Sequence, residues 1–256
     1  LKAREKPRES ILDGVPRSAL SRLCFDAGDY ELLRIVNDVL ARRGSSSMKR
    51  LLAPYLHPHG IKEMAAPKGL RIAYAVIHLL GSLEAGMAGD RLTALRSLRD
   101  EVMAAAESGL EKNTARVLLQ IMKELVRSRD TPRRQLELAH DFRSAASGRP
   151  RVVRQLLAEY HLLEMPEEWN QIAFDDHVHD ANTKGRKSPT HLIMDAWIKG
   201  IRRLTVIHYH FVRPETAAEL LEAAAIMDMR VDIGIECLAR HRGGHVKLVW
   251  APRGFS

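Results

Sequence analysis

Two histidine pairs stand in the last third of the chain, each at the end of a short apolar run. His177 and His179 are the first pair, and His208 and His210 are the second. Alternate side chains of a β-strand point the same way, so each pair could project from one face of a strand. Two imidazoles at this spacing can bind one divalent ion or two neighbouring ions. The pairs therefore predict metal chemistry.

Carboxylates accompany the histidines. Asp175 has the same strand parity as His177 and could bind the ion or orient a histidine that does. Glu236 ends a third apolar run, in Gly234-Ile235-Glu236. In parallel α/β sheets, ligands bind at the carboxyl ends of the strands. Three successive strands would then present imidazole or carboxylate at one edge of a sheet, where we expect the site.

The secondary structure expected from the sequence differs between the two parts of the chain, with helices first and alternating strands and helices afterwards. Before residue 168, apolar residues recur at steps of three and four, which is typical of helices, and we expect these at 30–43, 70–83, 91–106, 115–126, 132–146 and 151–162. After it we expect strands at 172–174, 203–207, 231–235 and 246–250 and helices at 189–200 and 214–229. Alternating strands and helices indicate βαβ units and a mostly parallel sheet. The sequence predicts a mainly α N-terminal helical domain of unknown role (1–168) followed by a partial α/β domain (169–256).

Composition narrows the class of protein. Of the 256 residues 45% are hydrophobic, enough for a sizeable core, and Cys24 and Cys237 give no disulfide framework. The longest apolar stretches, such as 73–80, are far shorter than the roughly 20 residues of a membrane span. We therefore expect a cytoplasmic protein without a membrane partner. The net charge of +8 permits nucleic-acid binding, but the basic residues are dispersed among acids, so we do not favour it.

The motifs resemble those of the PHP (polymerase and histidinol phosphatase) family of metal-dependent phosphoesterases. The family opens with Asp-x-His-x-His, which Asp175, His177 and His179 match. A glycine and a Ser-Pro precede its first helix, and Gly185 and Ser188-Pro189 fall at those places. The resemblance covers about the last 80 residues of the chain.

Later motifs also resemble the family, with departures. Gly234-Ile235-Glu236 matches its Gly-Ile-Glu, and His245 resembles the histidine that often precedes the next strand. Where the family has Ser-Asp-Gly, this chain has Thr183-Lys184-Gly185, so an amine replaces a carboxylate. The family's Asp-His on the second strand is absent as such. Counting forward along the chain puts Tyr209 at that ligand position, whereas counting back from Glu236 favours His210, which we prefer because imidazole is the better ligand.

The resemblance implies a PHP-type distorted β/α barrel whose first βα units lie in this chain. It also implies two or three divalent ions (Zn, Mn or Fe) that bind a phosphate ester and activate a water molecule to attack phosphorus. The metal ligands would be His177, His179, Glu236 and His210, with Asp175, His208 and His245 as weaker candidates. Near the same strand ends, Arg186, Lys187 and Arg213 could bind phosphate oxygens, although each is also an ordinary candidate for solvated surface.

The length of the chain bears on activity. A complete barrel needs about 200 residues or more, and only 169–256 follow the boundary. The chain also begins at Leu1 and ends at Ser256 without a closing helix, so we interpret it as a fragment of a longer phosphohydrolase and expect it to be inactive alone. The open edge of a half barrel would be covered by the helices or by dimerisation. The alternative is a non-catalytic helical module that binds a protein or polyanion, attached to a degenerate PHP-like domain.

Overall fold

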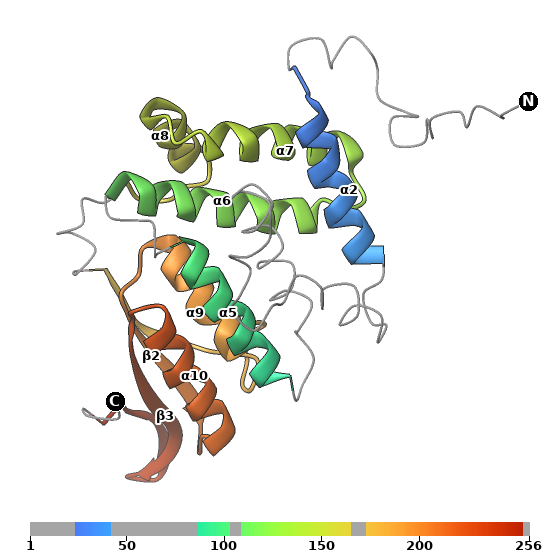
Figure 1. The fold of residues 1–256 in the computed structure, drawn as a ribbon. Helices are drawn as coiled ribbons and strands as arrows, with labels where there is room; N and C mark the ends of the chain where they lie inside the picture. Colours follow the sequence, from blue (N-terminus) through green and yellow to red (C-terminus); the bar gives the residue numbers. More distant parts are fainter. Residues whose placement is uncertain (1–23, 42–86, 103–108, 165–172, 253–256) are drawn as a thin grey trace, which may run out of the picture.

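The computed structural model describes residues 24–41, 87–102, 109–164 and 173–252. They contain seven helices and four strands, coloured along the chain in Figure 1. In order these are α2 (Ala27–Ala41), α5 (Ala88–Val102), α6 (Gly109–Arg127), α7 (Pro132–Ala146), α8 (Pro150–Glu159), β1 (Phe174–Val178), α9 (Pro189–Lys199), β2 (Arg203–Tyr209), α10 (Pro214–Ile226), β3 (Arg230–His241) and β4 (Gly244–Trp250). The chain is thus helical first and α/β afterwards, as the sequence predicts.

The ends of the helices follow from local chemistry. Proline occupies the first turn of α7, α8, α9 and α10, where its missing N–H costs no helical hydrogen bond. Gly200 ends α9 in the left-handed conformation, with φ 86°, which a residue without Cβ adopts freely. The helix expected at 70–83 and the domain boundary expected near residue 168 lie outside the described residues.

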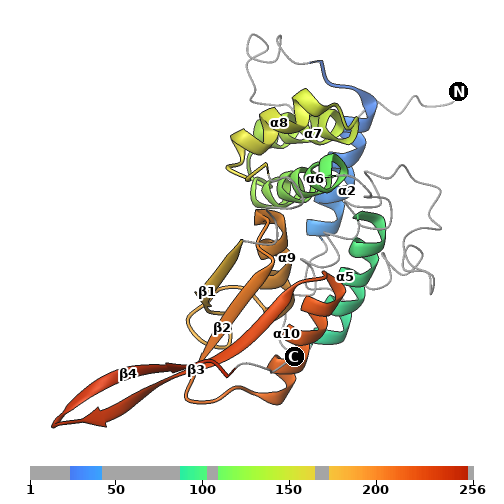
Figure 2. The ribbon, with the colours of Figure 1, turned by 90° about the vertical axis from the view of Figure 1, so that its left-hand side faces the viewer.

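The helices and the sheet share one apolar core. Helix α6 turns an apolar face inward, with Val117, Ile121 and Leu125 fully buried. Its neighbours α7 and α8 pack on one side of it, and α9 packs on the other. Helix α5 lies beside α9 and α10. Figures 1 and 2 show α9 and α10 packed against the sheet, with α5 and α6 forming a second layer behind them. The sheet is therefore covered on one face by helices from both halves of the chain.

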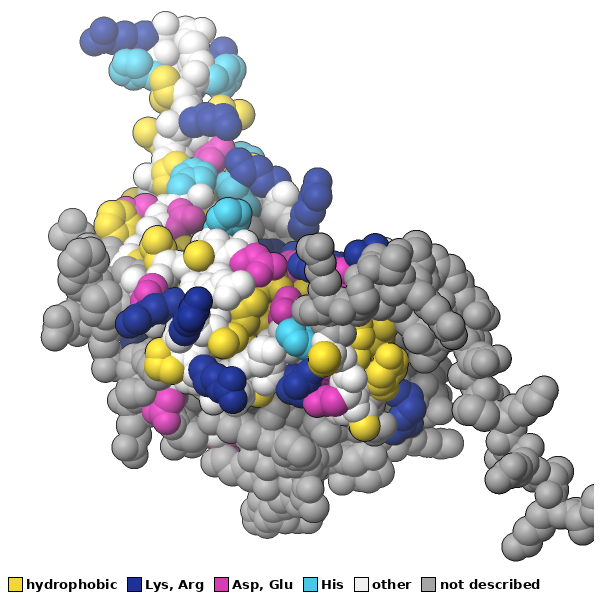
Figure 3. Space-filling model, turned by 90° about the horizontal axis from the view of Figure 1, so that it is seen from above, with side chains coloured by type: hydrophobic (Ala, Val, Ile, Leu, Met, Phe, Trp, Pro, Cys, Tyr) yellow, Lys and Arg dark blue, Asp and Glu magenta, His cyan; other side chains and the backbone are white. Residues whose placement is uncertain are grey.

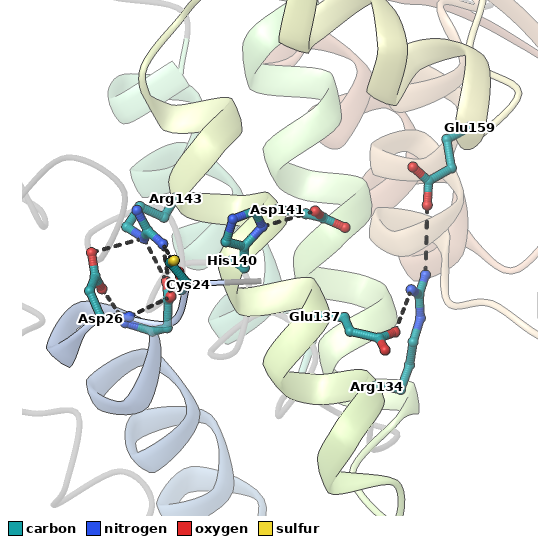
Figure 4. A network of polar contacts seen from close by, with 9 residues as sticks. Cys24, Asp26, Arg134, Glu137, His140, Asp141, Arg143 and Glu159 are labelled. Atoms are coloured by element: carbon teal, nitrogen blue, oxygen red, sulfur yellow. Dashed lines mark hydrogen bonds and ion pairs between the residues drawn. The ribbon is translucent and has the colours of Figure 1, made fainter. Parts of the chain in front are cut away.

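Ion pairs tie the outer helices together (Figure 4). The guanidinium of Arg143, on α7, contacts the carboxylates of Asp26 and Asp29 at the start of α2, at 3.0 and 2.8 Å. Asp29 is fully buried, so this contact supplies the partner that its charge requires. Arg134 reaches Glu137 on α7 and Glu159 at the end of α8. These pairs fix the packing of the helices on the side remote from the sheet.

The sheet has the order β1-β2-β3-β4. The first three strands are parallel and joined through α9 and α10, whereas β4 returns antiparallel to β3 across a turn at Gly243. Figure 2 shows the β3–β4 hairpin projecting beyond the rest of the molecule. Every residue of β4 is exposed, including Leu248 and Trp250. The sheet is thus mostly parallel, and β4 is its exposed edge on this side.

Within the described helices, none combines the length and apolar character that crossing a lipid bilayer demands.

Candidate metal centre

Parallel pairing brings the carboxyl ends of β1 and β2 to one edge, where β3 passes through Glu236 and continues into the hairpin. The register of β2 and β3 pairs Tyr209 with Glu236 and His208 with Ile235. Alternate residues of a strand face opposite sides of the sheet. Ile235 lines a groove on the side of α10, so Tyr209 and Glu236 face away from that helix while His208 faces it. The site is therefore on the face of the sheet opposite α10.

His177, His179 and Glu236 meet at this edge. Each offers one ligand atom, and the three atoms lie within 4.8 Å of one another. The Nε2 atoms of His177 and His179 are 3.2 Å apart, and His177 Nε2 is 3.7 Å from Glu236 Oε2. Two nitrogens that each lie about 2.05 Å from one tetrahedral ion would be roughly 3.3 Å apart. The spacing of the two imidazoles therefore fits a shared divalent ion.

The His179 ring is oriented by its other nitrogen. Its Nδ1 lies 3.1 Å from the hydroxyl of Thr183, which in turn contacts the carbonyl oxygen of Asp180 at 3.2 Å. Histidines that bind metal commonly use the second ring nitrogen in this way, which leaves Nε2 as the ligand. Burial and the charge of Lys184 lower the pKa of His179. The ring is thus neutral at physiological pH, the form in which imidazole binds metal.

The loop between β1 and α9 holds this arrangement through its backbone. The carbonyl oxygen of Asp180 accepts from the N–H groups of Thr183 and Gly185, at 3.1 and 2.9 Å. The buried Asp180 carboxylate accepts the N–H of Asn182 at 2.9 Å. A Cβ on Gly185 would lie 2.1 Å from the carbonyl oxygen of His179. Only glycine therefore fits against the main chain of this candidate ligand.

Glu236 is shared between the cluster and a lysine of the hairpin. Lys247, on β4, places Nζ 3.1 Å from Glu236 Oε1, while Oε2 faces His177. The hydrogen bond from Lys247 lowers the pKa of Glu236, which keeps the carboxylate charged. A second amine lies close by, because Nζ of Lys184 is 6.0 Å from the centre of the Tyr209 ring. Figure 3 shows histidine side chains gathered where the hairpin leaves the body, with basic side chains beside them.

Helix α9, which follows the loop, is anchored to the helical half of the chain. Thr190 donates its N–H and its hydroxyl to Glu219 on α10, at 3.2 and 2.6 Å. Arg91, on α5, donates two hydrogen bonds of 2.8 Å to the same carboxylate. Asp195 forms an ion pair with Lys123 of α6. The pKa of Asp195 and Glu219 is raised by burial, but their cationic partners outweigh this and lower it overall. The site loop thus rests on buried ion pairs between the two halves.

Several expected ligands are not brought to the cluster. Asp175 accepts a hydrogen bond from the main-chain N–H of His177 at 3.2 Å. His208 is buried on the helix side of the sheet, 3.7 Å from Asp180. His210 follows β2 in a left-handed turn, with φ 63°, and the ring of Tyr209 takes its place, 5.3 Å from that of His179. The strand register thus places His208 on the face of the sheet opposite the cluster, and the three residues that converge do not include His210.

His245 is also remote from the cluster. It pairs with Arg240 next to the hairpin turn. Arg240 is four positions beyond Glu236, which is about 13 Å along a strand. A single ion cannot span that distance, since it lies about 2 Å from each of its ligands.

The residues expected to bind phosphate have different surroundings. Lys187 forms an ion pair with the buried Asp195, which also pairs with Lys123. Arg186 is exposed in the loop before α9, and Arg213 is exposed at the residue that precedes α10.

The sequence interpretation missed two residues that the structure places at the cluster, Thr183 and Lys247. For Thr183 a signal was present, since it stands where the PHP pattern has serine; for Lys247 there was none.

The donor set itself fits a divalent ion. Two imidazole nitrogens and one carboxylate oxygen are the set used by catalytic zinc sites, which keep further positions for water or substrate. His177 is half exposed, so the cluster is accessible from solvent.

Comparison of the chain with models of known families, with curated proteins and with solved structures finds no match.

Proposed function

We propose that the chain is part of a cytoplasmic, metal-dependent phosphohydrolase of the PHP type, in which His177, His179 and Glu236 bind a divalent ion. One observation carries this proposal: ligand atoms of His177 and His179, at the end of β1, and of Glu236, the last residue of β3 that pairs with β2, converge within 4.8 Å. When bound, a Zn, Mn or Fe ion would polarise a phosphate ester and supply a hydroxide at neutral pH.

The protein's own groups prepare this chemistry. The hydroxyl of Thr183 fixes the ring of His179, and the contact with Gly185 fixes its main chain. Lys247 keeps Glu236 ionised. The three candidate ligands all lie in this chain, so we expect the chain on its own to bind metal.

Metal binding by the 256-residue chain tests the proposal. Titration with Zn²⁺ or Mn²⁺ should give about one equivalent bound, and the double substitution His177→Ala and His179→Ala should abolish it. His241→Ala, at the far end of the hairpin, is the matched control and should bind like the wild type. Less than about a tenth of an equivalent in the wild type would instead favour the non-catalytic interaction module.

Activity provides a second test in the longest native form of the protein. The same double substitution should abolish hydrolysis of a generic phosphate monoester such as p-nitrophenyl phosphate. If hydrolysis continued unchanged, these histidines would have no part in the mechanism.

A further inference from the structure

Two lysines flank the candidate metal cluster from different parts of the fold. Lys184 belongs to the loop between β1 and α9, and Lys247 belongs to β4. The first has its amine 6.0 Å from the centre of the Tyr209 ring, which itself lies 5.3 Å from the ring of His179. The second contacts Glu236 directly, at 3.1 Å. One lysine therefore stands on the histidine side of the cluster and the other on the glutamate side.

We propose that Lys184 and Lys247 form the phosphate-binding part of this site and adapt it to a phosphate monoester dianion. The inference rests on the metal centre proposed above and names residues that the sequence comparison with the PHP pattern does not supply. It assigns the role to these two lysines in place of Arg186, Lys187 and Arg213.

The charges of the site support a dianion. Two neutral imidazoles and one carboxylate carry one negative charge, and a divalent ion turns this into one positive charge. The two lysines add two more, so the occupied site attracts a doubly negative group more strongly than a singly negative one. A phosphate monoester is a dianion near neutral pH, whereas a phosphodiester carries a single charge. The site thus favours monoesters.

The geometry also lets the lysines reach a ligand. The side chain of Lys247 is 71% exposed, and its amine contacts Glu236. Glu236 uses Oε1 for this contact and faces His177 with Oε2, so an ion could bind Oε2 while Lys247 remains beside it. Lys187 differs, because it pairs with the buried Asp195. Binding a ligand through Lys187 would break this ion pair and leave the buried Asp195 with Lys123 as its cationic partner.

The binding of inorganic phosphate to the Mn²⁺-loaded chain tests the inference. Lys184→Met and Lys247→Met keep the aliphatic stems and remove the amines. Each should weaken phosphate binding about five- to tenfold, the effect of losing one charge-assisted hydrogen bond at a partly exposed site. Lys199→Met, at the opposite end of α9, is the matched control and should bind phosphate like the wild type. Calorimetry and the broadening of the phosphate signal in phosphorus NMR both measure this.

Two measurements, the preference between phosphate ligands and the binding of Mn²⁺, distinguish the lysine inference from the metal centre on which it rests. Dimethyl phosphate, which is a monoanion, should bind more weakly than inorganic phosphate to the wild type, and this preference should shrink in the lysine variants. Failure of the wild type to bind Mn²⁺ would overturn the metal centre and this inference together. Normal Mn²⁺ binding with unchanged phosphate affinity in both lysine variants would overturn the inference alone. A loss seen in Arg186→Met or Arg213→Met instead would move the role to those residues.

Discussion

The stability of this protein should fall between pH 7 and pH 5 because of one buried histidine, His191. It lies in the first turn of α9, beneath the site loop, with 4% of its surface exposed. Its Nδ1 is 2.6 Å from the hydroxyl of Ser188, and within the described part of the chain its buried Nε2 has no hydrogen-bond partner. A charged ring would therefore be poorly solvated.

The structure gives the size and sign of this effect. Burial lowers the pKa of His191 from 6.5 to about 4; Asp195 and Glu219 oppose the shift, and Arg91 and Lys123 add to it. In the unfolded chain the ring binds a proton near pH 6.5, and in the folded chain it does so only near pH 4. The unfolded state binds more protons between these values, so stability is lost as the pH falls through them. The loss between pH 7 and pH 5 is about 2 kcal/mol.

Urea unfolding of the wild type and of His191→Gln at several pH values measures this. The substitution removes the titrating ring, so the stability of the variant should depend less on pH, with a difference of about 2 kcal/mol between pH 7 and pH 5. His241→Gln, which alters an exposed histidine, should keep the full dependence of the wild type. Equal dependence in the wild type and in His191→Gln would refute the reasoning, because it would mean that His191 takes up its proton as readily folded as unfolded.

Three further substitutions test how the site is held. Gly185→Ala should weaken Mn²⁺ binding by at least about tenfold, because the new methyl group displaces the main chain of His179; normal binding in a titration would contradict the packing described here. Thr183→Val should lower Mn²⁺ affinity about 10- to 100-fold, since it removes the hydroxyl that orients the His179 ring. The same hydroxyl contacts the carbonyl oxygen of Asp180, so the cost in urea unfolding should be about 1 kcal/mol. Glu219→Gln should destabilise the fold by about 2 kcal/mol in the same unfolding assay, because a neutral amide replaces the carboxylate that pairs with the buried Arg91 guanidinium. A change below about 0.5 kcal/mol would contradict a stabilising role for this pair.

Much of the secondary structure could be predicted because local signals determine it. The helix at 132–146 agrees in both bounds, since Pro132 suits the first turn and Ser147-Gly148 ends the helix. The strands were harder, because a strand continues as long as its neighbour offers a partner. Strand β3 runs to His241 rather than ending at residue 235, because β4 pairs with it along the whole hairpin. This pairing depends on a contact between chain segments that periodicity alone does not show.

The candidate site was predictable where its residues are close in sequence. His177 and His179 stand two residues apart at the end of β1, and their rings do meet there, with centroids 5.1 Å apart, although the pairing of β1 with β2 is irregular between Asp175 and Val178. The choice between Tyr209 and His210 could not be made in this way, because it depends on where β2 ends and on its pairing with β3. The register sets Tyr209 beside Glu236, and the chain then turns at His210 into the left-handed conformation. A shift of one residue in this register would have reversed the two side chains.

Lys247 is the residue of the candidate site that is hardest to predict from the sequence. It lies eleven residues beyond Glu236, on a strand that the pattern identifies only as apolar. In the antiparallel register Lys247 pairs with Leu238, and Glu236 pairs with Val249. Lys247 and Glu236 are therefore diagonal neighbours on different strands, at a separation of about 7–8 Å between main chains that a lysine side chain can span. Lys247 thus adds its positive charge to the site because β4 runs antiparallel to β3. If β4 had followed through a parallel crossover connection, Lys247 would lie away from the cluster.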